Sequence, residues 1–139
     1  MSVPPLAARL GLEPHPEGGW FVRTWTAGAT LETPGGPRPA ATLIHFLLPA
    51  GDTSAWHVVS SDELWLWHGP GTLTLQLGGA GADPVDDGPL RSLGPPPDHD
   101  AQVLVPAGTW QRTLPGPADV LVSCLVSPGF DYADWRLHE

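Results

Sequence analysis

Short apolar stretches, most of them closed by proline or glycine, follow one another along much of this chain. In the clearest of them, Leu73, Leu75 and Leu77 alternate with polar residues, which is the two-residue period of a strand with one buried face. Stretches rich in apolar, aromatic or β-branched residues predict further strands at residues 20–25, 41–48, 62–68, 102–105, 110–113 and 120–127. This rhythm of short strands is typical of an all-β domain.

Only the beginning of the chain has a helical pattern. Residues 6–10 follow Pro4-Pro5 and precede Gly11, and these residues favour the start and the end of a short helix. No helical pattern separates the predicted strands, as a sheet of βαβ units would require. We therefore expect a sandwich, barrel or jelly roll with a short N-terminal helix, and residues 78–97 as one long irregular loop outside it.

The length of 139 residues suits a single domain, which we place at residues 1–139. Proline and glycine are frequent, at 18 and 17 residues, but 41% hydrophobic residues and 7 tryptophans supply a core that a disordered chain lacks. Because a net charge of -9 repels phosphate backbones, we expect no nucleic-acid partner. The absence of lysine excludes Schiff-base chemistry and a phosphate-binding loop with its lysine.

The compartment follows from cysteine and hydropathy. The single cysteine, Cys124, cannot form an intramolecular disulfide, and we expect it to be a small buried residue. The chain shows no charged-then-apolar leader and no apolar run of transmembrane length. We expect a cytoplasmic protein with no membrane partner.

His57 and Glu63 form the most promising chemical pair in the sequence. If His57 ends one strand and Glu63 begins the next, a hairpin would direct both side chains to the same interior. There they could bind a metal, or act as a general base and the group that orients it. The alternative is an ordinary turn with a surface carboxylate and a hydrogen-bonded histidine.

Several motifs in order along the chain carry a family resemblance. They are His15-Pro16-Glu17-Gly18-Gly19-Trp20, Ser54-Ala55-Trp56-His57, Asp62-Glu63-Leu64-Trp65, Val105-Pro106-Ala107-Gly108-Thr109-Trp110-Gln111 and Pro128-Gly129-Phe130-Asp131. Together they resemble the cupin superfamily, and more specifically its Cupin_5 branch, over roughly positions 6 to 137. The resemblance implies a double-stranded β-helix, the jelly-roll cupin barrel, with a ligand pocket inside and usually a homodimer. It implies no established reaction.

The residues at the metal positions depart from that pattern. Metal-binding cupins normally supply His-x-His, then Glu, then a further His, whereas Val59 stands at the second of these positions and Gln111 at the last. Amides are poor ligands for zinc or iron, so we expect no cofactor. The alternative is a weak divalent-metal site of His57, Glu63 and Gln111, completed by water, His45 or His68.

Strand alternation adds candidates for binding a ligand. It places Trp65 and Trp67 on the face that carries Glu63, where burial against indoles would raise the pKa of the carboxyl. Trp65 would line the pocket or, alternatively, pack in the core. Arg23, in an aromatic strand, would hold an anionic or carbonyl-bearing ligand; the alternatives are an ion pair with Glu17 or a subunit contact.

The remaining polar residues receive simpler interpretations. We expect His15, His99 and His138 to be exposed in loops or near the end of the chain. The lone tyrosine, Tyr132, lies near the C-terminus outside the motifs that indicate the pocket. Of the 15 acidic residues, Glu63 is the one that we expect inside the barrel.

The sequence thus predicts a cupin that binds a small molecule. Acid–base chemistry with His57 as base and Glu63 as orienter or acid would resemble that of the sugar-nucleotide epimerase type of cupin, an isomerase-like or epimerase-like enzyme. Gln111 and Arg23 would position oxygen atoms of the ligand. The alternatives are a ligand-binding cupin without turnover, and a metal-dependent oxygenase with a degenerate metal site. We also expect a homodimer, which the indoles of Trp20, Trp25 and Trp135 would support if they prove to lie outside the core.

Overall fold

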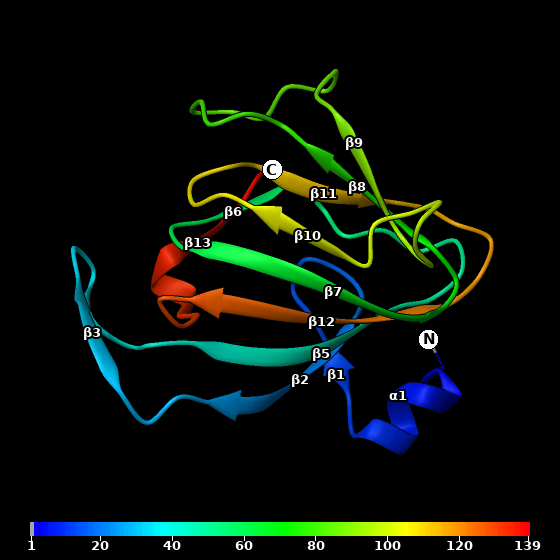
Figure 1. The fold of residues 1–139 in the computed structure, drawn as a ribbon, viewed down its shortest axis with the longest axis horizontal. Helices are drawn as coiled ribbons and strands as arrows, with labels where there is room; N and C mark the ends of the chain where they lie inside the picture. The colour runs from blue at the N-terminus through cyan, green and yellow to red at the C-terminus, as the bar shows by residue number, and fades with distance from the viewer. Residues whose placement is uncertain (1) are drawn as a thin grey trace.

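The computed structural model describes residues 2–139 and consists of two β-sheets that stack as layers (Figure 1). The elements, in chain order, are α1 (Pro5–Leu10), β1 (Glu13–Pro14), β2 (Trp20–Thr26), β3 (Thr30–Thr33), β4 (Gly36–Pro39), β5 (Thr42–Leu48), β6 (His57–Val59), β7 (Asp62–Pro70), β8 (Leu73–Leu77), β9 (Leu90–Leu93), β10 (Gln102–Val105), β11 (Gln111–Leu114), β12 (Val120–Ser127), the 3₁₀ turn η1 (Tyr132–Asp134) and β13 (Trp135–Leu137).

The two main sheets are antiparallel throughout, and each contains strands from both halves of the chain. One has six strands in the order β1-β2-β5-β12-β7-β10, and the other has five in the order β13-β6-β11-β8-β9. Strands β3 and β4 form a separate hairpin, and β3 lies away from the two layers at the left of Figure 1. This arrangement confirms the predicted jelly roll with a short N-terminal helix.

The expected long loop over residues 78–97 is wrong, because it contains β9, which pairs with β8. Of the four residues of β9, only Leu93 is buried, and Arg91 and Ser92 interrupt the apolar pattern that would have indicated a strand. The two-residue β1 and the hairpin β3–β4, whose segments contain prolines, were likewise not predicted.

The inner faces of the sheets meet in a core of large apolar side chains. Phe46, Trp65 and Val122 from the six-stranded sheet pack in one cluster with Leu75 and Leu93 from the five-stranded sheet. Trp65 and Phe46 meet edge to face, with ring centroids 5.8 Å apart. These apolar side chains fill one end of the barrel, and polar side chains lie toward the other end.

Helix α1 covers part of the outer face of the six-stranded sheet (Figure 1). Ala7 and Leu12 pack there against Trp20 and Leu47, and Gly11, with φ 70°, ends the helix in the left-handed conformation. No helix among residues 2–139 is long and apolar enough to cross a membrane.

Candidate functional site

A cavity of about 70 Å³ lies between the sheets, beside the core. Most of its wall is aromatic or aliphatic, including Phe21, Ile44, Phe46 and Val126. The ionisable side chains on the wall are His15, Glu17, Arg23, His57, Glu63, Cys124 and Tyr132. This concentration of ionisable groups in an apolar cavity makes it the candidate functional site.

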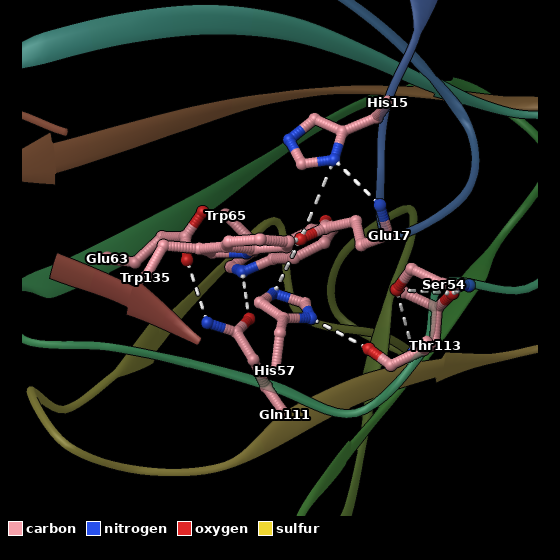
Figure 2. A network of polar contacts seen from close by, with 10 residues as sticks. His15, Glu17, Ser54, His57, Glu63, Trp65, Gln111, Thr113 and Trp135 are labelled. Atoms are coloured by element: carbon pink, nitrogen blue, oxygen red, sulfur yellow. Dashed lines mark hydrogen bonds and ion pairs between the residues drawn. The ribbon is translucent and has the colours of Figure 1, made fainter. Parts of the chain in front are cut away.

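Glu17 and His57 form the closest ionisable pair in the cavity (Figure 2). Glu17 Oε2 lies 3.2 Å from His57 Nε2, and both side chains are buried. Ala55 holds the two segments together, since its N–H donates to the Glu17 carbonyl at 2.7 Å while its own carbonyl lies 2.8 Å from His57 Nδ1. The pair is therefore positioned by backbone groups as well as by packing.

These contacts fix the tautomer of His57. A carbonyl oxygen can only accept, so Nδ1 carries a proton and donates it to Ala55. Nε2 is then the nitrogen that faces Glu17, and one proton must lie between it and Oε2 because two lone pairs would repel. His57 Nε2 and Glu17 Oε2 therefore act as a single proton-carrying unit on the cavity wall.

Burial shifts the pKa of Glu17 and that of His57 in the directions that favour the neutral form of each side chain. It raises the pKa of Glu17 to about 8, against a smaller opposing effect of the hydrogen bond that Trp135 Nε1 donates to Oε2 at 3.3 Å. It also lowers the pKa of His57, although the nearby Glu63 carboxylate opposes this. The proton thus resides mainly on Glu17 near neutral pH.

Glu63 is the second buried acid of the site and is held from below by a chain of hydrogen bonds (Figure 2). Gln111 Nε2 donates to Glu63 Oε1 at 2.7 Å, and Gln111 Oε1 accepts from Trp65 Nε1 at 3.0 Å. The Trp65 N–H therefore orients the amide so that its donor faces the carboxylate. Burial raises the pKa of Glu63 to about 7, with His57 opposing this and Glu17 adding to it.

Cys124 lies beside this acid and is buried, as the sequence predicts. Burial, followed by the nearby Glu63 and Glu17 carboxyls, raises the pKa of the thiol well above its ordinary value. A thiol kept protonated in this way is a poor nucleophile, so Cys124 is a packing residue of the cavity wall.

The segment that supplies Glu17 turns sharply into β2. Gly18 and Gly19 have φ of 109° and 77°, and a side chain on Gly18 would collide with the Thr53 carbonyl. The Glu17 N–H donates to His15 Nδ1 at 3.1 Å, so Nδ1 of this imidazole is unprotonated. Burial and then His57 lower the pKa of His15 to about 4, which keeps the ring neutral.

The mouth of the cavity carries more exposed groups. Arg23 is exposed and donates from Nη2 to the Phe130 carbonyl at 3.0 Å. Tyr132 is 48% exposed and packs edge to face against Phe130 and Trp135. A ligand entering the cavity would pass these groups before reaching Glu17, Glu63 and His57.

The structure brings together most of the residues singled out from the sequence, with corrections. His57 begins β6 rather than ending a strand, and Glu63 belongs to β7 of the other sheet, yet both line the same cavity. Arg23 also lines the cavity, and its hydrogen bond is to Phe130 rather than to Glu17. Trp65 and Gln111 lie behind Glu63, outside the cavity wall.

Two expectations about polar residues are wrong, and one residue of the wall lies outside the motifs. His15 is not an exposed loop residue, since its side chain is 6% exposed; Tyr132, outside the motifs, lines the cavity; and Glu17 is a second acid inside the barrel. The motif of residues 15–20 could have identified His15 and Glu17, because its two glycines indicate that the backbone of this segment lies close to another segment. His99 is half-buried, and only His138 is exposed as expected.

The residues present do not fit a zinc or iron ion. Among residues 2–139, no group of three His, Cys, Asp or Glu side chains is arranged to hold a metal. Val59 lines the cavity at a position where a metal ligand would be needed. The amide oxygen of Gln111 already accepts a hydrogen bond from Trp65 Nε1. The histidines that might have completed a site, His45 and His68, pack against each other, with His68 on Ser123, outside the cavity.

Comparison with known proteins agrees with the fold and the motifs. The sequence matches the family Cupin_5, described as Cupin superfamily (DUF985), over residues 5–138. A hypothetical protein from Leishmania major is 30% identical with a TM-score of 0.84, over 95% of this chain and 84% of that one. A protein from Shewanella oneidensis is 29% identical with a TM-score of 0.82, over 96% of this chain and 82% of that one.

A more distant neighbour, KdgF from Halomonas sp., shares the fold alone, at 18% identity and a TM-score of 0.59 over 88% of this chain and 89% of its own. No curated protein matches the sequence. The family match extends over nearly the whole chain and includes every segment that lines the cavity. The chain therefore belongs to the Cupin_5 family of the cupin superfamily.

Proposed function

We propose that the cavity binds a small organic molecule and exchanges protons with it. The observation that carries the proposal is the contact between Glu17 Oε2 and His57 Nε2 on the wall of an apolar cavity. The Nδ1–H bond to Ala55 leaves Nε2 as the reacting nitrogen. A pair that holds one proton near neutral pH can give it up or take another at little cost.

In this proposal His57 and Glu63 are the catalytic residues. To act as the base, His57 Nε2 exchanges its contact with Glu17 for the ligand and removes a proton from a carbon next to a carbonyl or carboxyl group, while protonated Glu63 gives its own proton to the opposite face of that carbon. The carbon is thereby inverted, and transfer of the proton from the His57 imidazolium to the Glu63 carboxylate restores both residues, so that the epimerisation involves no net change in atoms or electrons. No cofactor takes part.

The other selected residues have supporting roles. Glu17 shares a proton with His57 Nε2. Gln111 and Trp65 are positioning residues that orient Glu63. Arg23 at the mouth binds an oxygen-bearing group of the ligand. The alternative function is binding without turnover, which the mostly aromatic and aliphatic wall would also serve.

Solvent deuterium incorporation tests the proposal. Small hydroxy acids, keto acids and sugars are incubated with the protein in D2O, and loss of each C–H signal is followed by proton NMR. We expect exchange with at least one compound, and a rate lower by about 100-fold or more in His57→Ala and Glu63→Gln. His138→Ala, an exposed histidine outside the cavity, is the matched control.

Two results of that experiment contradict catalysis. Equal exchange in His57→Ala and the parent protein would show that His57 is not the base. A compound that binds in the cavity and is recovered without deuterium would favour the alternative of binding alone.

We further propose a homodimer formed through the outer face of the six-stranded sheet. Strand register places Trp25, Leu43, Leu125, Leu64 and Leu104 in one apolar row across five strands. Trp25 is 50% exposed and Leu104 is 47% exposed, and α1 covers only the other end of this face. Two chains of charge -9 need an uncharged surface to associate, and this row provides one.

A further inference from the structure

The charges inside the cavity are unevenly distributed. Glu17 and Glu63 are buried at its inner end, and among residues 2–139 neither forms an ion pair with an arginine. The chain has no lysine, and within residues 2–139 the basic groups that form ion pairs with these acids are the imidazoles of His15 and His57. Two acids without a permanent cation are costly to bury in ionised form.

The surroundings of these acids are rich in aromatic rings. Trp135 donates its N–H to Glu17 and packs edge to face with Tyr132. Phe21 and Phe46 also contribute to the wall. Ring faces attract ammonium groups, and an ammonium placed beside Glu17 and Glu63 would favour the ionised form of both carboxyls, which adds a second attraction for the same charge.

The mouth has the opposite character. Arg23 is the single arginine on the cavity wall, and its one side-chain hydrogen bond, to the Phe130 carbonyl, uses Nη2. No acid among the described residues forms an ion pair with Arg23. Its remaining N–H groups are suited to a carboxylate, which the planar guanidinium binds with two parallel hydrogen bonds.

We propose that the ligand of this cavity is a small zwitterion, with an ammonium group against Glu17 and Glu63 and a carboxylate at Arg23. This inference rests on the binding part of the proposed function and names the class of its ligand. The small volume of the cavity, about 70 Å³, favours short compounds such as short amino acids. The ammonium would provide the positive charge that the two acids lack within the chain.

Three probes with three carbon atoms each test the proposal: β-alanine carries both charges, propionate only the carboxylate and propylamine only the ammonium. Dissociation constants are measured by ligand-observed NMR with the full chain. We expect β-alanine to bind at least about tenfold more tightly than either of the others. Glu63→Gln should remove its advantage over propionate, and Arg23→Gln its advantage over propylamine.

Folding of each variant is checked by circular dichroism, and Arg91→Gln, an exposed arginine outside the cavity, is the matched control. Propionate binding as tightly as β-alanine, an unchanged preference in Glu63→Gln, or no binding of any probe would overturn the proposal. The proposed catalysis fails separately. Deuterium exchange on a compound without an ammonium group would support the proposed catalysis and contradict the proposal of a zwitterionic ligand. Binding of β-alanine without exchange would support the zwitterionic ligand and contradict the catalysis.

Discussion

The carboxylate of Glu17 contacts three side chains of the cavity wall through one oxygen. Oε2 lies 3.2 Å from His57 Nε2, 3.3 Å from Trp135 Nε1 and 3.8 Å from His15 Nδ1. Since the His15 nitrogen already accepts the Glu17 N–H, it cannot supply a proton to this oxygen. The proton on Glu17 is therefore shared with His57 alone. The two side chains titrate as a coupled pair, so neither has a pKa that is independent of the other.

The two buried acids predict how stability depends on pH. Folded Glu17 and Glu63 keep their protons up to pKa values of about 8 and about 7, whereas in the unfolded chain they lose them near 4.5. Unfolding then releases protons, so stability falls as pH rises. Below pH 6.5 the lowered pKa values of His15 and His57 have the opposite effect on stability, because these histidines take up protons on unfolding. The fall in stability should therefore be visible between pH 6.5 and 8.

Calorimetry across this pH range checks the prediction. The melting temperature of the parent protein should fall from pH 6.5 to 8, and the decline should be flatter in the double variant Glu17→Gln/Glu63→Gln. Asp98→Asn, an exposed acid in a loop, should keep the parent slope. A double variant with that same slope would show that these carboxyls are not the groups responsible.

At the scale of single residues, sequence reasoning found only part of the site. The alternation of β7 placed Glu63, Trp65 and Trp67 on one face, because a strand fixes side-chain direction locally. Glu17 lies in a turn 40 positions before His57, and no local period relates the two. Their contact depends on the Gly18-Gly19 turn packing against residues 53–55, which is a tertiary property.

At the scale of elements, Ser54 and Thr113 link the segment before β6 to β11. The Ser54 N–H donates to Thr113 Oγ1 at 2.6 Å, and the Thr113 N–H donates to Ser54 Oγ at 3.2 Å. A third bond joins the two hydroxyls at 3.0 Å, and both residues are buried. This link holds the backbone on which Ala55 positions His57 (Figure 2).

Thr113→Val should therefore destabilise the fold by about 1–3 kcal/mol, because it leaves the buried Ser54 N–H without its acceptor and removes the bond between the two hydroxyls. Thr113→Ser retains the hydroxyl and should lose much less. Urea unfolding measures both. If Thr113→Val were as stable as Thr113→Ser, the two hydrogen bonds of the Thr113 hydroxyl would contribute nothing to holding the two segments together.

A second link joins the hairpin β3–β4 to η1. Arg38 donates from Nε and Nη2 to the two carboxylate oxygens of Asp134, at 2.8 and 3.1 Å. Asp134 lies between Tyr132 and Trp135, which line the cavity mouth. The hairpin therefore supports one side of the mouth, although it lies outside both main sheets.

Removing this link should loosen the mouth. In Arg38→Met the amides of η1 and β13 should exchange with solvent faster in deuterium-exchange mass spectrometry, while those of β12 stay protected. Arg9→Met, on the surface of α1, is the control. Unchanged exchange at η1 in Arg38→Met would mean that neighbouring packing alone fixes the turn.

The strands that sequence analysis predicted best are those with the strongest local signal. Strands β10 and β12 have the predicted bounds, since each is rich in β-branched residues or leucine and is bounded by turn residues. Strand β9 was missed because its hydrogen bonds to β8, rather than its own apolar pattern, place it in the sheet. Such strands depend on tertiary pairing that no local window contains.

At the scale of the whole molecule, the two faces of the six-stranded sheet have different roles. The inner face carries Glu63 and the cavity, and the outer face carries the apolar row from Trp25 to Leu104. A register shift between Arg23 and Trp25 directs these neighbours to opposite faces. One irregularity in β2 therefore serves both the cavity and the proposed dimer.

The dimer proposal predicts a concentration-stable particle of twice 14.7 kDa in light scattering coupled to size exclusion. Leu104→Glu should shift the mass toward the monomer, because it adds a charge at the end of the apolar row where Leu104 is 47% exposed. Leu90→Glu changes a leucine that is 57% exposed on β9 of the other sheet, and this variant should remain dimeric. A parent mass of 14.7 kDa, or dissociation by Leu90→Glu alone, would contradict this interface.

The most direct test of the account is the protonation of His57 itself. Two-bond ¹⁵N–¹H correlation spectra of histidine-labelled protein distinguish the two ring nitrogens. We predict that His57 is protonated on Nδ1 near neutral pH, and that Glu17→Gln changes the shift of Nε2 while Nδ1 keeps its proton. A His57 ring that carries its proton on Nε2 alone, or an Nε2 shift unaffected by Glu17→Gln, would contradict the shared-proton pair.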